Sequence, residues 1–282
     1  MKALFAIFAF IAGGMFVFTT PVWPQADVYP WLAEYDSSDA ITNRIPAPDG
    51  YERAATTQGT FEHWLSHLSL KEGKPPVYLY NGEMKFNQSA HVAVVDIDVG
   101  NRDLQQCADA IMRLRAEYLR SIGNYEAIHF NFTSGHRADF TRWIAGFRPL
   151  VNGNNVKWIK SQEEDASYGS FRAYLTKVFI YAGSQSLSGE LHSVEDMNEM
   201  RIGDLFIQGG FPGHAVLVVD MAMNGRTGKK LFLLAQSYMP AQDIHVLKNP
   251  GNNASDPWYK LDFGETLRTP EWTFSRDDLK RF

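Results

Sequence analysis

The hydrophobic residues between positions 103 and 121 recur at the spacing of a helix. They stand at i, i+3, i+7, i+10 and i+14, with charged residues between them: Leu104, Cys107, Ile111, Leu114 and Tyr118. Apolar residues at this spacing form one face of an amphipathic helix. The segment therefore predicts a helix that packs one side against a core.

Three further helices are indicated. Thr60 is a good N-cap, and the apolar residues after it again keep helical spacing: Phe61, Trp64, Leu65 and Leu68. Residues 138–143 predict a short helix, and residues 168–181 predict a longer one.

Runs rich in β-branched and aromatic residues, bounded by turn residues, predict strands. The predicted strands are residues 77–80, 91–98, 126–132, 203–207, 214–220 and 230–236. The last two are joined by a turn at residues 224–228. Residues 249–282 predict irregular covering structure.

The order of these elements predicts the fold class. Helices come first and hairpin strands follow, which favours an α+β domain with N-terminal helices packed on an antiparallel sheet. We expect residues 27–282 to form this single domain. Residues 27–59, rich in Pro, Asp, Thr and Ser, are interpreted as an extended arm.

Composition removes several classes of function. The chain has 282 residues, 27 of them Lys or Arg and 32 Asp or Glu, which gives a net charge of −5. With no block of basic residues, the chain lacks the positive surface that nucleic-acid binding usually requires. Its single cysteine cannot form an intrachain disulfide or a multi-cysteine metal site. We therefore expect no nucleic-acid partner, no metal and no cofactor.

Residues 1–26 have the shape of a signal peptide, with Lys2 before an apolar run that ends at Phe18. The cleavage signal is poor because Pro24 stands at the −3 position. Residues 4–23 also approach the length that spans a bilayer, so an uncleaved membrane anchor is the alternative. In both cases we expect the body of the protein to be exported, in the periplasm or outside the cell.

Cys107 has two interpretations. If Asp103 or Asn101 caps the helix, Cys107 lies one turn into it, where the helix dipole and free amides favour a thiolate nucleophile. Its place in the apolar stripe fits a buried small hydrophobe equally well. The side-chain amide of Gln105 or Gln106 could stabilise an oxyanion beside the thiol.

A nucleophilic cysteine needs a base. His214 opens a strong strand directly after the glycine-rich loop of residues 209–213, which allows close approach of a substrate. Its alternative role is that of a histidine bonded to a carbonyl at the start of its strand. Asp220 cannot orient this imidazole, because six residues of extended strand separate them by about 20 Å.

The neighbouring strand offers a better orienting group. If the hairpin is centred on Arg226, Val216 faces Gln236, and Gln236 then shares a sheet face with His214. A register slip of one residue would present Ser237 instead.

Two resemblances follow from these residues. Residues 203–207 (Gly-Asp-Leu-Phe-Ile) and 212–219 (Pro-Gly-His-Ala-Val-Leu-Val-Val) resemble the signature of papain-like cell-wall peptidases and amidases. This resemblance implies a papain-like fold and hydrolysis of an amide bond, with Cys107 as nucleophile, His214 as base and Gln236 as orienting group.

Over almost the whole exported region, the chain more closely resembles an uncharacterised family of bacterial envelope proteins. The motifs are residues 105–110 (Gln-Gln-Cys-Ala-Asp-Ala), 212–214 (Pro-Gly-His) and 235–240 (Ala-Gln-Ser-Tyr-Met-Pro). This second resemblance implies no known activity.

Two other pairs of residues have plain interpretations. His63 and His67 stand four apart on a predicted helix, but Trp64 occupies the position of the glutamate in the His-Glu-x-x-His zinc motif, so we expect a helix edge. Arg113 and Glu117 predict a surface i, i+4 pair that stabilises its helix by a few tenths of a kcal/mol.

The sequence therefore supports two hypotheses. The first is an exported cysteine hydrolase that cleaves or transfers an amide bond, with peptidoglycan stem peptides or another envelope peptide as its substrate. The second is a non-catalytic envelope binding or scaffold protein that uses the same cleft. They differ in whether Cys107 is a reactive thiol close to His214.

Overall fold

A nine-stranded sheet carries both strands of the predicted site. The computed structural model describes residues 28–251 and 257–282. The main path of the sheet runs β2-β11-β10-β9-β8-β15-β7, while β1 pairs with β9 and β12 pairs with β10. Its strands are β1 (Glu52–Arg53), β2 (His91–Val94), β7 (His192–Ser193), β8 (Leu205–Gln208), β9 (His214–Met223), β10 (Lys230–Gln236), β11 (His245–Leu247), β12 (Tyr259–Lys260) and β15 (Leu279–Arg281). All of these pairings are antiparallel, which confirms the predicted α+β class with an antiparallel sheet.

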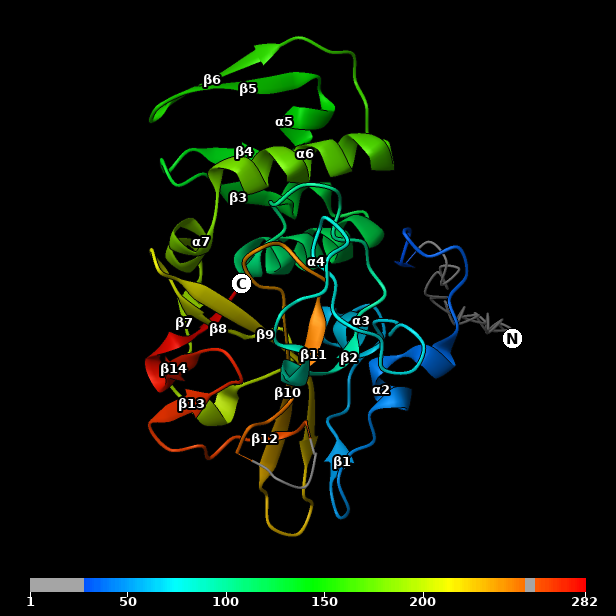
Figure 1. The fold of residues 1–282 in the computed structure, drawn as a ribbon. Coiled ribbons are helices and arrows are strands. Elements are labelled where there is room, and N and C mark those ends of the chain that lie inside the picture. The colour runs from blue at the N-terminus through cyan, green and yellow to red at the C-terminus, as the bar shows by residue number, and fades with distance from the viewer. Residues whose placement is uncertain (1–27, 252–256) are drawn as a thin grey trace, which may run out of the picture.

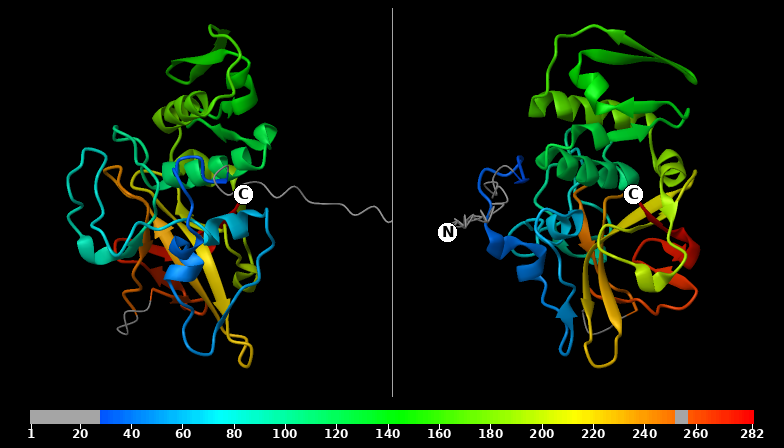
Figure 2. Two further views of the ribbon diagram at one scale, coloured as in Figure 1. Left: turned by 90° about the vertical axis from the view of Figure 1, so that its right-hand side faces the viewer. Right: turned by 180° about the vertical axis from the view of Figure 1, so that it is seen from behind.

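Helix α4 (Cys107–Ser121) separates this sheet from a second layer. Figure 1 shows α4 above β2, β10 and β11 and below the elements of residues 129–181, and α4 contacts β9 and β10. Both views of Figure 2 place the hairpin of β5 (Phe147–Asn152) and β6 (Asn155–Lys160) at the end of this layer farthest from the sheet. The first residues of α4 therefore lie where the two layers meet.

The other described helices are short, except α6. They are α2 (Ile41–Arg44), α3 (Phe61–Ser66), α5 (Phe140–Ile144), α6 (Tyr168–Tyr181) and α7 (Ser184–Glu190). Single turns of 3-10 helix are η1 (Ser37–Asp39), η2 (Gln88–Ala90), η3 (Tyr125–Ala127), η4 (Met197–Glu199) and η5 (Arg276–Asp278). Two further small hairpins pair β3 (His129–Asn131) with β4 (Arg137–Asp139) and β13 (Thr266–Arg268) with β14 (Thr273–Ser275).

Several elements match the sequence prediction closely. Helix α6 and strand β10 have the predicted bounds, and α3 starts directly after Thr60. The Thr60 hydroxyl accepts a hydrogen bond from the backbone N–H of His63 at 3.3 Å, as an N-cap does. These segments were predictable because the capping residue, the hydrophobic periodicity and the length of each segment all indicate the same element.

Other predictions were wrong. Residues 77–80 do not form a strand beside residues 91–98; they make only isolated bridges, Tyr78 to Met84 and Leu79 to Gln242. The C-terminal tail is not irregular, since it supplies β12 to β15. Helix α7 was not predicted, because its residues 184–190 are rich in Gly and Ser.

Helix α4 begins at Cys107, four residues later than predicted. Gln106 is the N-cap with extended backbone angles, and its N–H donates to the Asp109 carboxylate at 3.2 Å. This interaction between the N-cap and the third helical residue defines a helix start. It leaves the preceding residues, Asp103 included, in turns before the helix.

The pairing of β9 with β10 contains a β-bulge. Leu233 pairs with Asp220, but the next residue, Leu234, pairs with Val218, so Val219 is the extra residue on β9. Beyond the bulge the register is the one predicted for the site, which aligns Gln236 with Val216. Without the bulge, every later side chain of β10 would be displaced by one residue and lie on the opposite face.

The structure describes η1, α2 and β1 within the predicted arm of residues 27–59. The predicted signal peptide, residues 1–26, lies outside the described residues. In the part of the chain that the structure describes, no helix is long and apolar enough to cross a membrane.

Candidate active site

A cavity of about 530 Å³ lies where the start of α4 meets the ends of β9 and β10. The glycine-rich loop of residues 209–213 forms one wall. The side chains that line it include Gln106, Cys107, Asp109, His214, Tyr238 and Trp272. Chain segments far apart in the sequence thus place a thiol and an imidazole on one cavity.

Cys107 is the first residue of α4, not a residue one turn inside it. The backbone N–H groups of the first helical turn have no acceptor within the helix, so they point toward the cavity end of α4. Burial, together with the nearby charge of Asp109, raises the pKa of the Cys107 thiol to about 11. Backbone N–H groups oppose this shift, among them that of Ala215.

The expected thiolate is therefore not the resting form of Cys107. The helix dipole favours a thiolate, but the loss of water around the sulfur outweighs it. The thiol and the imidazole of His214, at the start of β9, line the same cavity. The structure thus brings together two residues that are 107 positions apart in the sequence.

His214 is buried at the start of β9, with 2% of its surface exposed. Its Nε2 lies 2.8 Å from Oε1 of Gln236. Two aromatic rings cover the imidazole, with centroid distances of 4.6 Å to Tyr238 and 5.3 Å to Trp272. Burial lowers the pKa of His214 to about 4, although the bond to Gln236 acts in the opposite direction.

Gln236 is the residue that the structure places against His214, and Ser237 is not. The Ser237 hydroxyl is buried and donates to the carbonyl oxygens of Gln105 and Gln242, at 3.1 and 2.8 Å. The bulge at Val219 decides between the two candidates, because it restores the register that turns Gln236 to the His214 face.

Of the two candidate oxyanion donors, only Gln106 lines the cavity. Its amide Nε2 donates to Asp103 at 3.0 Å. The amide of Gln105 is used elsewhere, since it is buried, donates to the carbonyl of Asp98 and accepts from Arg113 at 2.8 Å. Gln105 is thus a structural residue, and the proposal for an oxyanion donor is limited to Gln106 and the N–H of Cys107.

Arg113 and Glu117 are not a surface pair, because both side chains are fully buried. Arg113 donates to Asp98 at 2.7 Å and to Glu117 at 3.4 Å. Tyr168 donates to Glu117 at 2.8 Å, and Arg172 donates to Asp98 at 2.8 Å. We call these five residues the Arg113 cluster; it joins α4 to α6 and holds Gln105 away from the cavity.

Comparison with known proteins identifies a family. Residues 41–281 match the family model described as a domain of unknown function (DUF4846). The chain belongs to this family. No curated protein and no solved structure matched the chain, so the comparisons lend no support to the papain-like resemblance.

Sequence reasoning missed several residues of the site. Glu271 accepts from Gln236 Nε2 at 2.8 Å, and Lys85 donates to both carboxylate oxygens of Glu271 at 2.7 and 2.8 Å. His245 Nε2 lies 3.4 Å from Gln236 Nε2. Glu271 and Lys85 lie in irregular segments with no periodic pattern. The one local signal that could have indicated them is a charged residue next to an aromatic one, Trp272 and Phe86.

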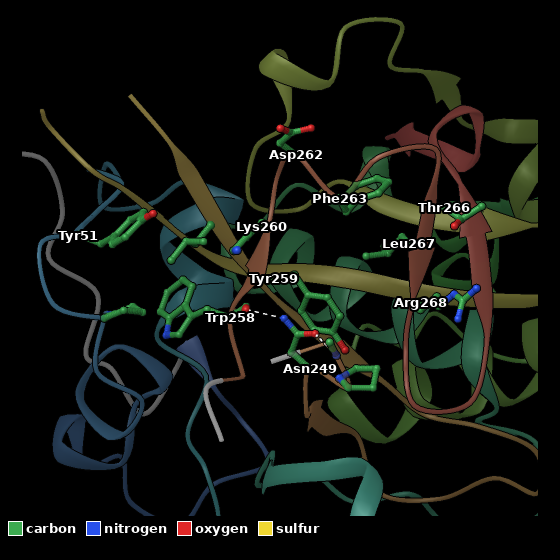
Figure 3. Close-up of a pocket in the computed structure, with 14 residues that line it drawn as sticks. Tyr51, Asn249, Trp258, Tyr259, Lys260, Asp262, Phe263, Thr266, Leu267 and Arg268 are labelled. Atoms are coloured by element: carbon green, nitrogen blue, oxygen red, sulfur yellow. Dashed lines mark hydrogen bonds between the residues drawn. The ribbon is translucent and has the colours of Figure 1, made fainter. Parts of the chain in front are cut away.

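A larger cavity, of about 730 Å³, lies beside β12, and Figure 3 shows its lining. Its polar groups bond back to the protein. Asn249 donates to the carbonyl of Trp258 at 2.8 Å (Figure 3). The Tyr259 hydroxyl donates to the carbonyl of Lys248 at 2.6 Å. Its described lining contains no cysteine and no histidine. This cavity therefore lacks a nucleophile paired with a base.

His63 and His67 do not face a third ligand. Their rings stack with centroids 3.9 Å apart, and His67 Nδ1 lies 2.7 Å from the carbonyl of His63. Among the residues that the structure describes, no group of three or more His, Cys, Asp or Glu side chains could hold a metal ion.

Proposed function

We propose that the protein is a cysteine hydrolase that cleaves or transfers an amide bond. Cys107 is the nucleophile, His214 the general base and Gln236 the group that orients the imidazole. The observation that carries the proposal is the 2.8 Å contact between His214 Nε2 and Gln236 on the cavity that Cys107 also lines. A thiol on the same cavity as an imidazole that a third group orients is the combination of residues that covalent catalysis uses.

The proposed reaction has two halves. In the first, Cys107 Sγ attacks the carbonyl carbon of the substrate while His214 takes the thiol proton, and the oxyanion accepts from the N–H of Cys107 and the amide of Gln106. The imidazolium then protonates the leaving amine as the carbon–nitrogen bond breaks. In the second, His214 activates water, which hydrolyses the thioester and restores the thiol; an amine in place of water gives transfer.

The two pKa values indicate when the proton moves. A thiol with a pKa of about 11 and an imidazole with a pKa of about 4 remain neutral at rest. The thiol proton thus passes to His214 only as Sγ attacks a bound substrate, so the negative charge moves to the substrate oxyanion and is balanced by the imidazolium. We expect slow reaction of Cys107 with small alkylating agents at neutral pH.

The cavity favours an uncharged or apolar segment of substrate. Aromatic and apolar side chains predominate around the thiol, and the charged residues of its described lining are Asp103 and Asp109, without Lys or Arg. Phe211 and Met239, on its rim, are 96% and 56% exposed. An envelope peptide, such as a peptidoglycan stem peptide bound through its alanine residues, is the proposed substrate.

The second candidate function is binding without catalysis. The raised pKa of Cys107 favours it, because a neutral buried thiol is a poor nucleophile. The same cavity would then bind an envelope peptide and release it unchanged.

The test is incubation of the purified protein with a digest of peptidoglycan and with a casein peptide digest, followed by mass spectrometry. New amide cleavage that disappears in Cys107→Ser and in His214→Gln supports the hydrolase. Peptide retention without cleavage, unchanged in Cys107→Ser, supports the binding protein and overturns the catalytic proposal.

A further inference from the structure

The side-chain amide of Gln236 lies between three polar groups. On one side, Oε1 is 2.8 Å from His214 Nε2. On the other, Nε2 is 2.8 Å from a carboxylate oxygen of Glu271 and 3.4 Å from Nε2 of His245. The orientation of this amide decides which ring nitrogen of His214 carries the hydrogen. An amide oxygen accepts a hydrogen bond, whereas an NH₂ group donates one.

Glu271 determines the direction of the amide. A carboxylate only accepts hydrogen bonds, so the NH₂ group of Gln236 must face it. Rotation of the amide by half a turn would place two oxygens in contact and leave a buried donor without an acceptor. His245 agrees with this direction: its Nδ1 lies 2.8 Å from the carbonyl of Asp243, which leaves Nε2 to accept from Gln236.

Lys85 keeps Glu271 in place. Its ammonium donates to both carboxylate oxygens, at 2.7 and 2.8 Å, and the two side chains are 6% and 13% exposed. An ammonium offers only donors, so both oxygens of Glu271 accept from it and the side chain is fixed in one orientation. Glu271 lies in the turn between β13 and β14, directly before Trp272, whose ring covers His214.

We propose that Glu271, held by Lys85, is a positioning residue that sets the tautomer of His214 through Gln236. Because Oε1 of Gln236 faces His214, Nε2 carries the hydrogen and Nδ1 keeps the lone pair. We call Lys85, Glu271, Gln236 and His214 the Glu271 network. The tautomer depends only on these contacts, whereas the use of Nδ1 as base rests on the proposed function.

The variant Glu271→Gln provides a sharp test. Lys85 would bond to the carbonyl oxygen of the new amide, which would turn its NH₂ group toward Gln236. Gln236 would then rotate and present its own NH₂ group to His214, which places the hydrogen on Nδ1. Its oxygen would accept from the new amide, and the long 3.4 Å contact with His245 Nε2 would be lost. We expect the tautomer to invert and hydrolysis to fall at least about 100-fold, the lower range of general-base catalysis.

The measurement is a two-bond ¹⁵N–¹H correlation spectrum of the ¹⁵N-histidine-labelled protein at pH 7, assigned with His214→Gln. Wild type is expected to show a protonated Nε2 and a bare Nδ1, and Glu271→Gln the reverse. Asp204→Asn is the matched control, because Arg281 donates to both oxygens of Asp204 at 2.7 and 2.8 Å in the same sheet, away from the cavity. It should leave the tautomer unchanged.

A double variant separates positioning from loss of stability. The double variant Gln236→Glu, Glu271→Gln exchanges the amide and the carboxylate between the two positions. The carboxylate at position 236 then accepts from His214 and from the amide at position 271, so the wild-type tautomer and the wild-type total charge are restored. We expect bare Nδ1 again and recovery of at least about tenfold in hydrolysis over Glu271→Gln alone.

Two results would overturn the proposal: a hydrogen on Nδ1 in wild type, or an unchanged tautomer in folded Glu271→Gln. If Glu271→Gln does not fold, Lys85→Met at pH 7 replaces it, with a mixture of both tautomers expected and the wild-type tautomer alone as the contradicting result. Failure of the proposed function appears separately, as absence of cleavage by a wild type that shows the expected tautomer.

Discussion

The Glu271 network and the Arg113 cluster both combine charged with polar side chains around buried members, but the two networks are connected differently. The Arg113 cluster closes on itself, since two arginines and two carboxylates bond to one another between α4 and α6. The Glu271 network is linear, and its last member is an imidazole that lines a cavity. A closed network holds elements together, whereas an open one can position a reactive group.

The largest effect is expected when the thiol that His214 is proposed to deprotonate is removed. Cys107→Ala should reduce hydrolysis by about four to six orders of magnitude, as loss of a catalytic nucleophile does. Its melting temperature should change little, because the substitution removes one partly buried sulfur. Peptide cleavage and thermal unfolding of the same preparation check this prediction. Cleavage at the wild-type rate would remove Cys107 from the site.

Substitutions in the Arg113 cluster should change the free energy of unfolding and leave the chemistry at His214 unchanged. Arg113→Met leaves Glu117 buried without its nearest cation, although Tyr168 still donates to it, and should lower the free energy of unfolding by about 3 kcal/mol. Arg113→Met combined with Glu117→Leu should restore much of this loss, because no unpaired charge remains. Urea denaturation measures both. A loss below about 1 kcal/mol for the single variant would contradict the structural role, and a changed His214 tautomer would show that the two networks are coupled.

The histidines of the site should make stability depend on pH. Burial lowers the pKa of His245 to about 3 in the folded state, against about 6.5 in the unfolded chain. Between these values the unfolded state binds more protons, so stability is present above pH 6.5 and is lost as the pH falls, by up to about 1.4 kcal/mol per pH unit.

His245→Gln should remove this contribution and flatten the fall in stability between pH 6.5 and 4. Urea denaturation across this range, compared with wild type and with the exposed His136→Gln, measures the difference. Equal slopes for wild type and His245→Gln would contradict a neutral buried imidazole.

The smallest effect is expected at the rim of the cavity. Phe211→Ala should raise the KM for a peptide substrate several-fold, and stability should change by no more than about 0.5 kcal/mol because the ring is 96% exposed. Phe86, also fully exposed but not part of the described lining, is the matched control. Equal KM values for the two alanine variants would place the substrate elsewhere.

Part of this picture could be predicted from the sequence. Helix α6 and strand β10 were recognised from local patterns, and Cys107, His214 and Gln236 were selected as residue types suited to one reaction. The start of α4 was misplaced because Leu104 continues the apolar period into residues that the structure holds in turns. The choice between Gln236 and Ser237 stayed open because no local pattern marks the bulge at Val219.

The sequence by itself determined the α+β class and the candidate chemistry of the chain, because periodicity, caps and residue types act over a few neighbouring positions. Only the tertiary structure decided how these residues are used. In the folded protein, Arg113 and Glu117 are buried, and Gln105 bonds to Arg113 instead of lining the cavity. The pKa of the Cys107 thiol is raised, and Glu271, paired with Lys85, bonds to Gln236. The physical reason is that burial and hydrogen-bond partners depend on segments distant in the chain, which no local pattern contains.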